Sequence, residues 1–237
     1  MQVRTLSDPR SFVHYDQFRI KGQCIVAQSG QSDTPMSWES MVQIHPVQRI
    51  NNLSNTYTMA KYSTKENRLQ INSDGSDFKG TGKIGFGFVA KVDGKLYKYS
   101  GTEKSPVVLK LAELYPDATF SNPTMEMTAL LMALSEFRQT SEHLLIIQDY
   151  KGAVCYDGLW QFSDGSEQRS DKPWKAKEPY IALLVQRAKE IAQRITIQGG
   201  SVEIRWIKGH TGDEMNDLAD KAAKDRDEYN TFTELLN

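Results

Sequence analysis

The stretch that most constrains the fold is KIGFGFVAKV, which covers residues 83–92. Its larger apolar side chains recur at every second position, which is the spacing of a β-strand with one buried face. These positions are Ile84, Phe86, Phe88, Ala90 and Val92. Gly85 and Gly87 stand between them, and glycines on the other face indicate that a neighbouring element approaches closely. The pair Asp93-Gly94 then predicts a tight hairpin turn into residues 95–101.

The segments around this hairpin predict further parts of a sheet. Residues 68–74 have the pattern of a short strand that ends in a turn at Asp74-Gly75-Ser76, which completes a three-stranded antiparallel meander. A helix follows, with Asn122 as a possible cap and Pro123 suited to the first turn. The sequence HLLIIQD, residues 143–149, is continuously apolar until its end, as expected for a strand buried on both faces.

The last third of the chain alternates helix, strand and helix. Residues 178–195 follow helical spacing, residues 201–207 form a strand, and Thr211-Gly212-Asp213-Glu214 is a capping box that opens a final helix to about Arg226. The order predicts an α/β fold with a mixed five-stranded sheet, an antiparallel meander plus parallel strands, and helices on both faces. We expect residues 66–237 to form this domain and residues 1–65 to form an irregular N-terminal extension of unclear role.

Composition excludes several classes of protein. The chain has 237 residues, enough to bury a core, and its lack of an apolar run of about 18 residues argues against a membrane span. Its first residues lack the apolar stretch of a secretory signal, and two cysteines are too few for a disulfide framework, so we expect a reduced, cytoplasmic setting. A net charge of -1 argues against a protein that coats nucleic acid through bulk charge.

Four carboxylates stand out by their positions. Asp74 ends the first strand, Glu126 lies near the start of the first helix, Asp149 ends the buried strand, and Asp220 lies in the final helix. If the first and fourth strands are neighbours, Asp74 and Asp149 emerge side by side, and a helix across that edge brings Glu126 to them. Carboxylates gathered in this way repel one another unless a cation lies among them. Oxygen ligands select Mg²⁺ or Mn²⁺, and two such ions about 4 Å apart suit phosphodiester cleavage.

Each of these residues has an ordinary explanation when it is taken alone. Asp74 then belongs to a hairpin turn, Glu126 favours a helix start electrostatically, Asp149 caps the following helix, and Asp220 is a solvated helix residue. Independent causes of this kind do not explain four carboxylates in this order, together with the glycine-flanked loop that carries His210.

A basic segment, RSDKPWKAK at residues 169–177, leaves two interpretations open. It contains Lys172 and Lys175 on either side of Trp174. It is either a solvated charged face or a surface that follows phosphates, which often combines basic residues with an aromatic ring. Trp174 itself serves equally well for packing or for contact with nucleic acid.

Taken together, the motifs resemble those of type 1 ribonuclease H over residues 66–228. The shared pattern is an Asp-Gly-Ser segment on the first strand, Met-Glu in the first helix, an Asp after the fourth strand, and a His-x-Gly loop followed by Asn and Asp. In this sequence the pattern is formed by Asp74-Gly75-Ser76, Met125-Glu126, Asp149, His210-Thr211-Gly212, Asn216 and Asp220.

The resemblance implies a ribonuclease H-like fold, hydrolysis of the RNA strand of RNA/DNA hybrids, and two Mg²⁺ ions for which Mn²⁺ can substitute. It implies that Asp74 bridges both ions, that Asp220 helps to hold the ion that activates water, and that Glu126 and Asp149 hold the ion at the leaving 3′ oxygen. His210 would assist proton transfer or product departure. The implied substrate-binding residues are Gly75, Ser76, Asn122, Lys172, Trp174, Lys175 and Asn216.

Three segments depart from the family pattern: DFKGTG after Ser76, Tyr150-Lys151 in place of Ser-Gln after Asp149, and a longer connection over residues 102–121. Two alternatives therefore stand beside hybrid cleavage. One is another nuclease of this fold that acts on DNA junctions or double-stranded RNA. The other is a non-cleaving module that binds nucleic acid, which the presence of all four carboxylates disfavours. We expect the chain to act as a monomer or within a larger replication assembly.

Overall fold

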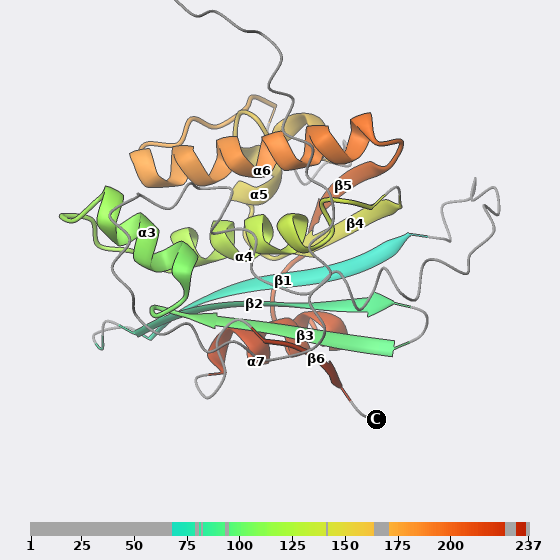
Figure 1. Ribbon diagram of the computed structural model, residues 1–237, viewed down its shortest axis with the longest axis horizontal. Coiled ribbons are helices and arrows are strands. Elements are labelled where there is room, and N and C mark those ends of the chain that lie inside the picture. The colour runs from blue at the N-terminus through green and yellow to red at the C-terminus, as the bar shows by residue number, and fades with distance from the viewer. Residues whose placement is uncertain are drawn as a thin grey trace, which may run out of the picture. The chain divides into compact units, whose positions relative to one another are not determined.

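A mixed six-stranded sheet forms the centre of the protein, in the order β5-β4-β1-β2-β3-β6 (Figure 1). The computed structural model describes residues 68–235 apart from 79–80, 82, 93–94, 141, 164–170 and 226–230. The strands are β1 (Leu69–Phe78), β2 (Lys83–Val92), β3 (Lys95–Thr102), β4 (His143–Gln148), β5 (Ser201–Trp206) and β6 (Thr231–Leu235).

The five strands predicted from the sequence are present with the predicted directions. β1, β2 and β3 form the antiparallel meander, β4 runs parallel to β1, and β5 runs parallel to β4. β6 adds a sixth strand that the sequence did not predict, antiparallel to β3 at the edge of the sheet. Its five residues are too few to show a period, and it pairs with a single strand.

Helices cover both faces of the sheet, as predicted. α4 lies against β1 and β2 with α6 beside it, and α7 packs on the opposite face against β1, β2 and β3 (Figure 1). The helices are α3 (Pro106–Leu114), α4 (Asn122–Glu136), α5 (Gly152–Cys155), the short 3-10 helix η1 (Trp160–Phe162), α6 (Pro179–Ile197) and α7 (Glu214–Lys224). α3 lies in the long connection before α4, where no element was predicted.

The alternation of β2 explains how both layers pack. Phe86 and Phe88 are fully buried, and the Phe88 ring stacks on Tyr99 of β3 with 5.0 Å between ring centroids. Gly87 faces α7, where an added Cβ would lie 2.7 Å from the Ala222 Cβ. The predicted close approach at the glycines of β2 is therefore confirmed, and the approaching element is α7.

The prediction of a turn at Asp74-Gly75-Ser76 is wrong. β1 continues through these residues to Phe78, with Asp74 opposite Gly87 of β2. Gly75 is needed because a Cβ there would overlap the backbone nitrogen of Glu126, so the glycine marks the crossing of α4 over β1. The chain turns only after Phe78, whose carbonyl oxygen accepts a 3.0 Å hydrogen bond from the backbone N–H of Thr81.

The helix starts also differ in detail from the prediction. Ser121, not Asn122, is the N-cap of α4, and its backbone N–H donates to Thr124 Oγ1 at 3.3 Å. Asp213, not Thr211, caps α7, because its side chain accepts the backbone N–H of Asn216. In both cases the cap lies within two residues of the predicted one, so the direction and position of each helix are unaffected.

Two predictions concern the chain more broadly. Within the residues that the structure describes, no helix is long and apolar enough to cross a membrane. The predicted N-terminal extension, residues 1–65, lies outside the described residues.

Candidate active site

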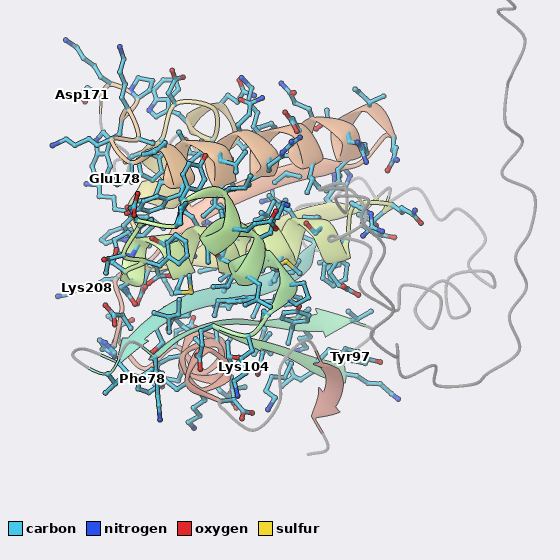
Figure 2. All side chains as sticks on the ribbon, turned by 60° about the vertical axis from the view of Figure 1, so that its left-hand side comes forward. Phe78, Tyr97, Lys104, Asp171, Glu178 and Lys208 are labelled. Atoms are coloured by element: carbon cyan, nitrogen blue, oxygen red, sulfur yellow. The ribbon has the colours of Figure 1, made fainter. Side chains whose placement is uncertain are left out.

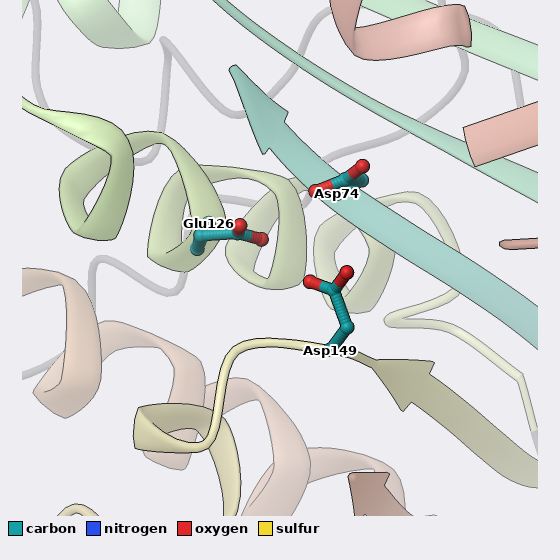
Figure 3. A group of neighbouring side chains, drawn as sticks. All are labelled: Asp74, Glu126 and Asp149. Atoms are coloured by element: carbon teal, nitrogen blue, oxygen red, sulfur yellow. The ribbon is translucent and has the colours of Figure 1, made fainter. Parts of the chain in front are cut away.

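Three acidic side chains meet where β1, β4 and α4 come together. The parallel pairing of β1 with β4 brings Asp74 near Asp149, which directly follows β4, and α4 crosses β1 with Glu126. Figure 3 shows the three carboxylates pointing toward one another. Each offers an oxygen atom, and these atoms all lie within 4.8 Å of one another. We call Asp74, Glu126 and Asp149 the acidic triad.

Several hydrogen bonds fix the carboxylate of Glu126. The backbone N–H of Gly75 donates both to Glu126 Oε2 at 2.9 Å and to Asp74 Oδ1 at 2.7 Å. Asn122 Nδ2 donates to Glu126 Oε1 at 3.0 Å. Gln148 Nε2 donates to the Glu126 carbonyl oxygen at 2.7 Å and to Oε2 at 3.2 Å. Glu126 is therefore held in place before any metal or substrate arrives.

Asp149 is positioned by β5 and by the loop that follows it. Trp206 Nε1 donates to the Asp149 carbonyl oxygen at 2.7 Å, and an added Cβ on Gly209 would lie 3.1 Å from Asp149 Cγ. The loop before α7 thus lies directly against the carboxylate. The sequence analysis gave no role in the site to Trp206 or to Gln148, which are paired across β4 and β5.

The triad carries a strong electrostatic cost. Burial, followed by the charges of Asp149 and Asp220, raises the pKa of Asp74 to about 7. Burial and the charges of Asp74 and Asp149 raise the pKa of Glu126 well above its ordinary value. Three anions held this close in a largely buried place are stable only with protons or a cation among them.

His210 and Asn216 act on the third carboxylate. Burial raises the pKa of Asp149, while the charge of His210 and a hydrogen bond from the Asn216 side chain oppose this rise. His210 is exposed on its loop with a φ of 57°, and Asn216 is buried in α7. The structure therefore brings both predicted residues to the triad.

Asp220 approaches the triad without joining it. Its charge contributes to the raised pKa of Asp74 and of Asp149, so Asp220, which belongs to α7, lies near both carboxylates. In the described part of the chain it is not among the carboxylates that lie within 4.8 Å of one another. Instead, Lys224 Nζ lies 2.6 Å from Asp220 Oδ1, in an ion pair along α7.

The predicted basic segment borders a groove beside the triad. Trp174 is 39% exposed, and Trp174 and Lys175 line a groove of about 680 Å³ together with Tyr150, the residue after Asp149. Lys172 is exposed but is not among the residues that line it. Figure 2 shows Asp171, which lies within this segment, and Glu178, which directly follows it, on the same side of the sheet and helices as Lys208.

Two of the remaining predicted substrate contacts, Gly75 and Asn122, lie at the triad. The Gly75 N–H and the Asn122 amide donate hydrogen bonds to triad carboxylates. The third, Ser76, is buried in β1 two residues after Asp74.

Comparisons with known proteins agree with this geometry. The family model described as RNase H matches residues 66–228. The ribonuclease H of Maricaulis maris (strain MCS10) is 27% identical over 157 residues, which cover 66% of this chain and 91% of that protein. The ribonuclease H of Actinobacillus pleuropneumoniae serotype 5b (strain L20) is 29% identical over 161 residues, which cover 66% and 88%.

Among solved structures, the crystal structure of RNase H1 from the halophilic archaeon Halobacterium salinarum NRC-1 is similar to this chain with a TM-score of 0.44. The two are 17% identical, and the match covers 67% of this chain and 99% of that one.

Proposed function

This chain belongs to the RNase H family, and we propose on that basis that it hydrolyses the RNA strand of RNA/DNA hybrids, leaving 5′-phosphate and 3′-hydroxyl ends. The observation that carries the proposal is the acidic triad, whose carboxylate oxygens lie within 4.8 Å of one another where β1, β4 and α4 come together. Buried carboxylates in this number suit divalent cations, and divalent cations suit the charge of a phosphodiester.

The donor set fits Mg²⁺, with Mn²⁺ as a substitute, because all the ligand atoms are hard carboxylate oxygens. We assign two ions to Asp74, Glu126, Asp149 and Asp220, the last after its carboxylate leaves Lys224. When bound, such ions activate a water molecule and stabilise the leaving 3′ oxygen. The chain itself supplies position, since the hydrogen bonds to Glu126 already fix its carboxylate.

We assign proton transfer or product departure to His210. It is exposed on the loop that packs against Asp149, which leaves the imidazole open to a bound nucleic acid. Histidine changes its charge near neutral pH, which suits either role.

Substrate contacts are assigned to two groups of residues. Gly75, Asn122 and Asn216 lie at the triad, and Ser76 follows Asp74 by two residues on β1. The buried Oδ1 of Asn216 has no hydrogen-bond partner among the described residues. Lys172, Trp174 and Lys175 lie on the exposed basic segment, where they would hold the phosphates and a base or sugar of the hybrid.

We further propose that residues 66–237 form the catalytic domain, that residues 1–65 form an extension, and that the protein acts in the cytoplasm as a monomer or within a larger replication assembly. The triad is complete within one chain, so the proposed reaction needs no residue from a second copy. The start of the family match at residue 66 supports the domain boundary.

The test is cleavage of a labelled RNA/DNA hybrid in Mg²⁺ by the wild type and by Asp74→Asn. We expect cleavage of the RNA strand by the wild type and its loss in the variant. Lys104→Ala is the matched control, because this surface residue has no part in the triad or the groove. Equal cleavage by Asp74→Asn and the wild type, or no cleavage by the wild type in Mg²⁺ or Mn²⁺, contradicts the proposal.

A substrate panel separates the two alternatives. Preference for a DNA junction or for double-stranded RNA over the hybrid indicates a different nuclease of this fold. Hybrid binding that EDTA leaves unchanged, with no cleavage in any divalent metal, indicates a non-cleaving module.

A further inference from the structure

Tyr150 links the acidic triad to the groove. It follows Asp149 directly in the chain, and its half-buried ring lines the groove together with Tyr156 and Trp174. Pro123, one turn before Glu126 on α4, lines the same groove. A nucleotide whose phosphate lies at the triad therefore has Tyr150 as an immediate neighbour on the groove side.

The backbone leaves space for the Tyr150 ring. An added Cβ on Gly152 would lie 2.5 Å from Tyr150 Cζ and 2.8 Å from its hydroxyl oxygen. Such distances are shorter than van der Waals contact, so any side chain at position 152 would displace the ring. Gly152 thus has a specific reason to be glycine, which is the placement of this phenol.

The hydroxyl of Tyr150 is oriented by a second tyrosine. The Tyr150 and Tyr156 hydroxyl oxygens lie 2.8 Å apart, so one donates a hydrogen bond to the other. The accepting hydroxyl keeps its own hydrogen, and both keep lone pairs, so the pair can still donate to and accept from a third group. Tyr156 is buried, which makes Tyr150 the more accessible of the two.

The segment that carries Trp174 is fixed to the same structure. Trp174 donates its backbone N–H to the Cys155 carbonyl oxygen, and its own carbonyl accepts the N–H of Asp157, both at 2.7 Å. The Trp174 ring lies edge-on to Tyr156 with 6.3 Å between centroids. Tyr150, Tyr156 and Trp174 therefore form one connected aromatic wall that leads away from the triad.

The charges of the groove indicate what it binds. Lys175 and Lys177 line it against the single carboxylate of Glu178, which favours an anionic strand over a neutral ligand. Rings and lysines together suit a sugar-phosphate chain with stacked bases. The 2′-hydroxyl is the group that distinguishes a ribose from a deoxyribose at one position, and it both donates and accepts.

We propose that Tyr150 is a specificity-determining residue whose hydroxyl, oriented by Tyr156, contacts the ribose 2′-hydroxyl of the nucleotide next to the phosphate held at the acidic triad. This assignment rests on the proposed hydrolysis of the RNA strand. It gives a function to the tyrosine that stands after Asp149 and to the glycine that makes room for it.

The experiment measures the effect of removing the Tyr150 hydroxyl and the effect of removing single 2′-hydroxyls of the substrate, each alone and both together. A hybrid with one defined cut site is prepared with all ribose, and with single 2′-deoxy substitutions at each nucleotide flanking the cut. The ratio kcat/KM is measured for each substrate with the wild type and with Tyr150→Phe. For the wild type we expect one position where the deoxy substitution lowers kcat/KM by about 3- to 10-fold, as for loss of a neutral hydrogen bond. For Tyr150→Phe we expect that loss already on the all-ribose substrate, with no further loss at that position.

Two more variants separate this role from a purely structural one. Tyr115→Phe is the matched control, because Tyr115 is not among the residues that line the groove and its hydroxyl lies 3.5 Å from the Pro179 carbonyl oxygen. It should keep the wild-type pattern of deoxy penalties. Gly152→Ala keeps the hydroxyl but displaces the ring, and should behave like Tyr150→Phe. Thermal unfolding of each variant shows that the differences do not come from loss of the fold.

The outcomes distinguish this assignment from the proposed function. If the wild type cleaves the hybrid and Tyr150→Phe shows the same deoxy penalty at every position, the assignment to the 2′-hydroxyl is overturned while the function stands. If the wild type cleaves no hybrid, the function and the assignment fall together.

Discussion

The buried carboxyl of Glu136 should make the stability of the protein depend on pH, and the structure gives the size of this effect. This residue ends α4, is 5% exposed, and has a buried Oε1 with no hydrogen-bond partner among the described residues. Burial raises the pKa of its carboxyl to about 7, against a partial opposing effect of Arg138. Glu136 lies ten residues from Glu126 along α4, so its ionisation can be followed separately from the triad.

The sign and size of the effect follow from this pKa. The unfolded chain loses the proton near pH 4.5, whereas the folded chain holds it until about pH 7. Below pH 4.5 the carboxyl is protonated in both states, so its burial does not reduce the free energy of unfolding. As the pH rises to about 7, the unfolded chain is ionised while the folded chain is not, and the free energy of unfolding falls. A tenfold change in an equilibrium corresponds to about 1.4 kcal/mol, so the total loss is about 3 kcal/mol.

Glu136→Gln should remove this loss. We expect the variant to be more stable than the wild type by about 3 kcal/mol at pH 8, and to differ from it little at pH 4.5. Urea denaturation at both pH values, in EDTA, gives the free energy of unfolding of each protein. Both proteins contain the same triad, so the effect of its ionisation cancels when one free energy is subtracted from the other. The reasoning would be refuted if the difference in the free energy of unfolding between the two proteins stayed constant or shrank from pH 4.5 to pH 8.

Three further predictions concern the site and the packing around it. Asp74→Asn should raise the melting temperature of the metal-free protein at pH 8 and abolish its rise on addition of Mg²⁺, as thermal scans would show, because the substitution removes a repelling ligand. Trp206→Phe removes the hydrogen bond to the Asp149 carbonyl and should lower kcat about 3- to 10-fold, with a loss of about 1 kcal/mol in the free energy of unfolding. Gly87→Ala should destabilise the protein by about 1–3 kcal/mol in urea denaturation, because its Cβ would lie 2.7 Å from the Ala222 Cβ.

The sheet could be predicted because its strands have distinct patterns. β2 shows period two although both of its faces are buried, because large apolar side chains fill one face and Gly85 and Gly87 admit α7 on the other. β4 shows no such period, because its residues after the first are apolar without interruption up to Gln148. α3 was missed although Pro106 begins it and Val107, Val108 and Leu111 are buried at helical spacing. Its nine residues are short for a periodic signal.

The glycines of β1 and β2 show why the surroundings of the triad were predicted only in part. Gly85 and Gly87 were correctly attributed to close packing, whereas Gly75 was attributed to a turn, although all three lie beneath a helix. A sequence does not distinguish a glycine that needs an unusual backbone angle from one that needs space. The contacts of Gln148 and Trp206 were missed because they depend on tertiary packing: Gln148 meets Glu126 where α4 lies on the sheet, and Trp206 meets Asp149 through the register of β4 with β5.

The ends of the cleaved RNA test the central claim most directly. The wild type is incubated with a hybrid in Mg²⁺, with EDTA as a control, and the chemical ends of the product are determined. If water attacks at a metal site held by Asp74, Glu126 and Asp149, the products carry 5′-phosphate and 3′-hydroxyl ends and none form in EDTA. Products with a 2′,3′-cyclic phosphate, or cleavage that persists in EDTA, would contradict the account, since either shows that the carboxylates and their metal ions do not direct the reaction.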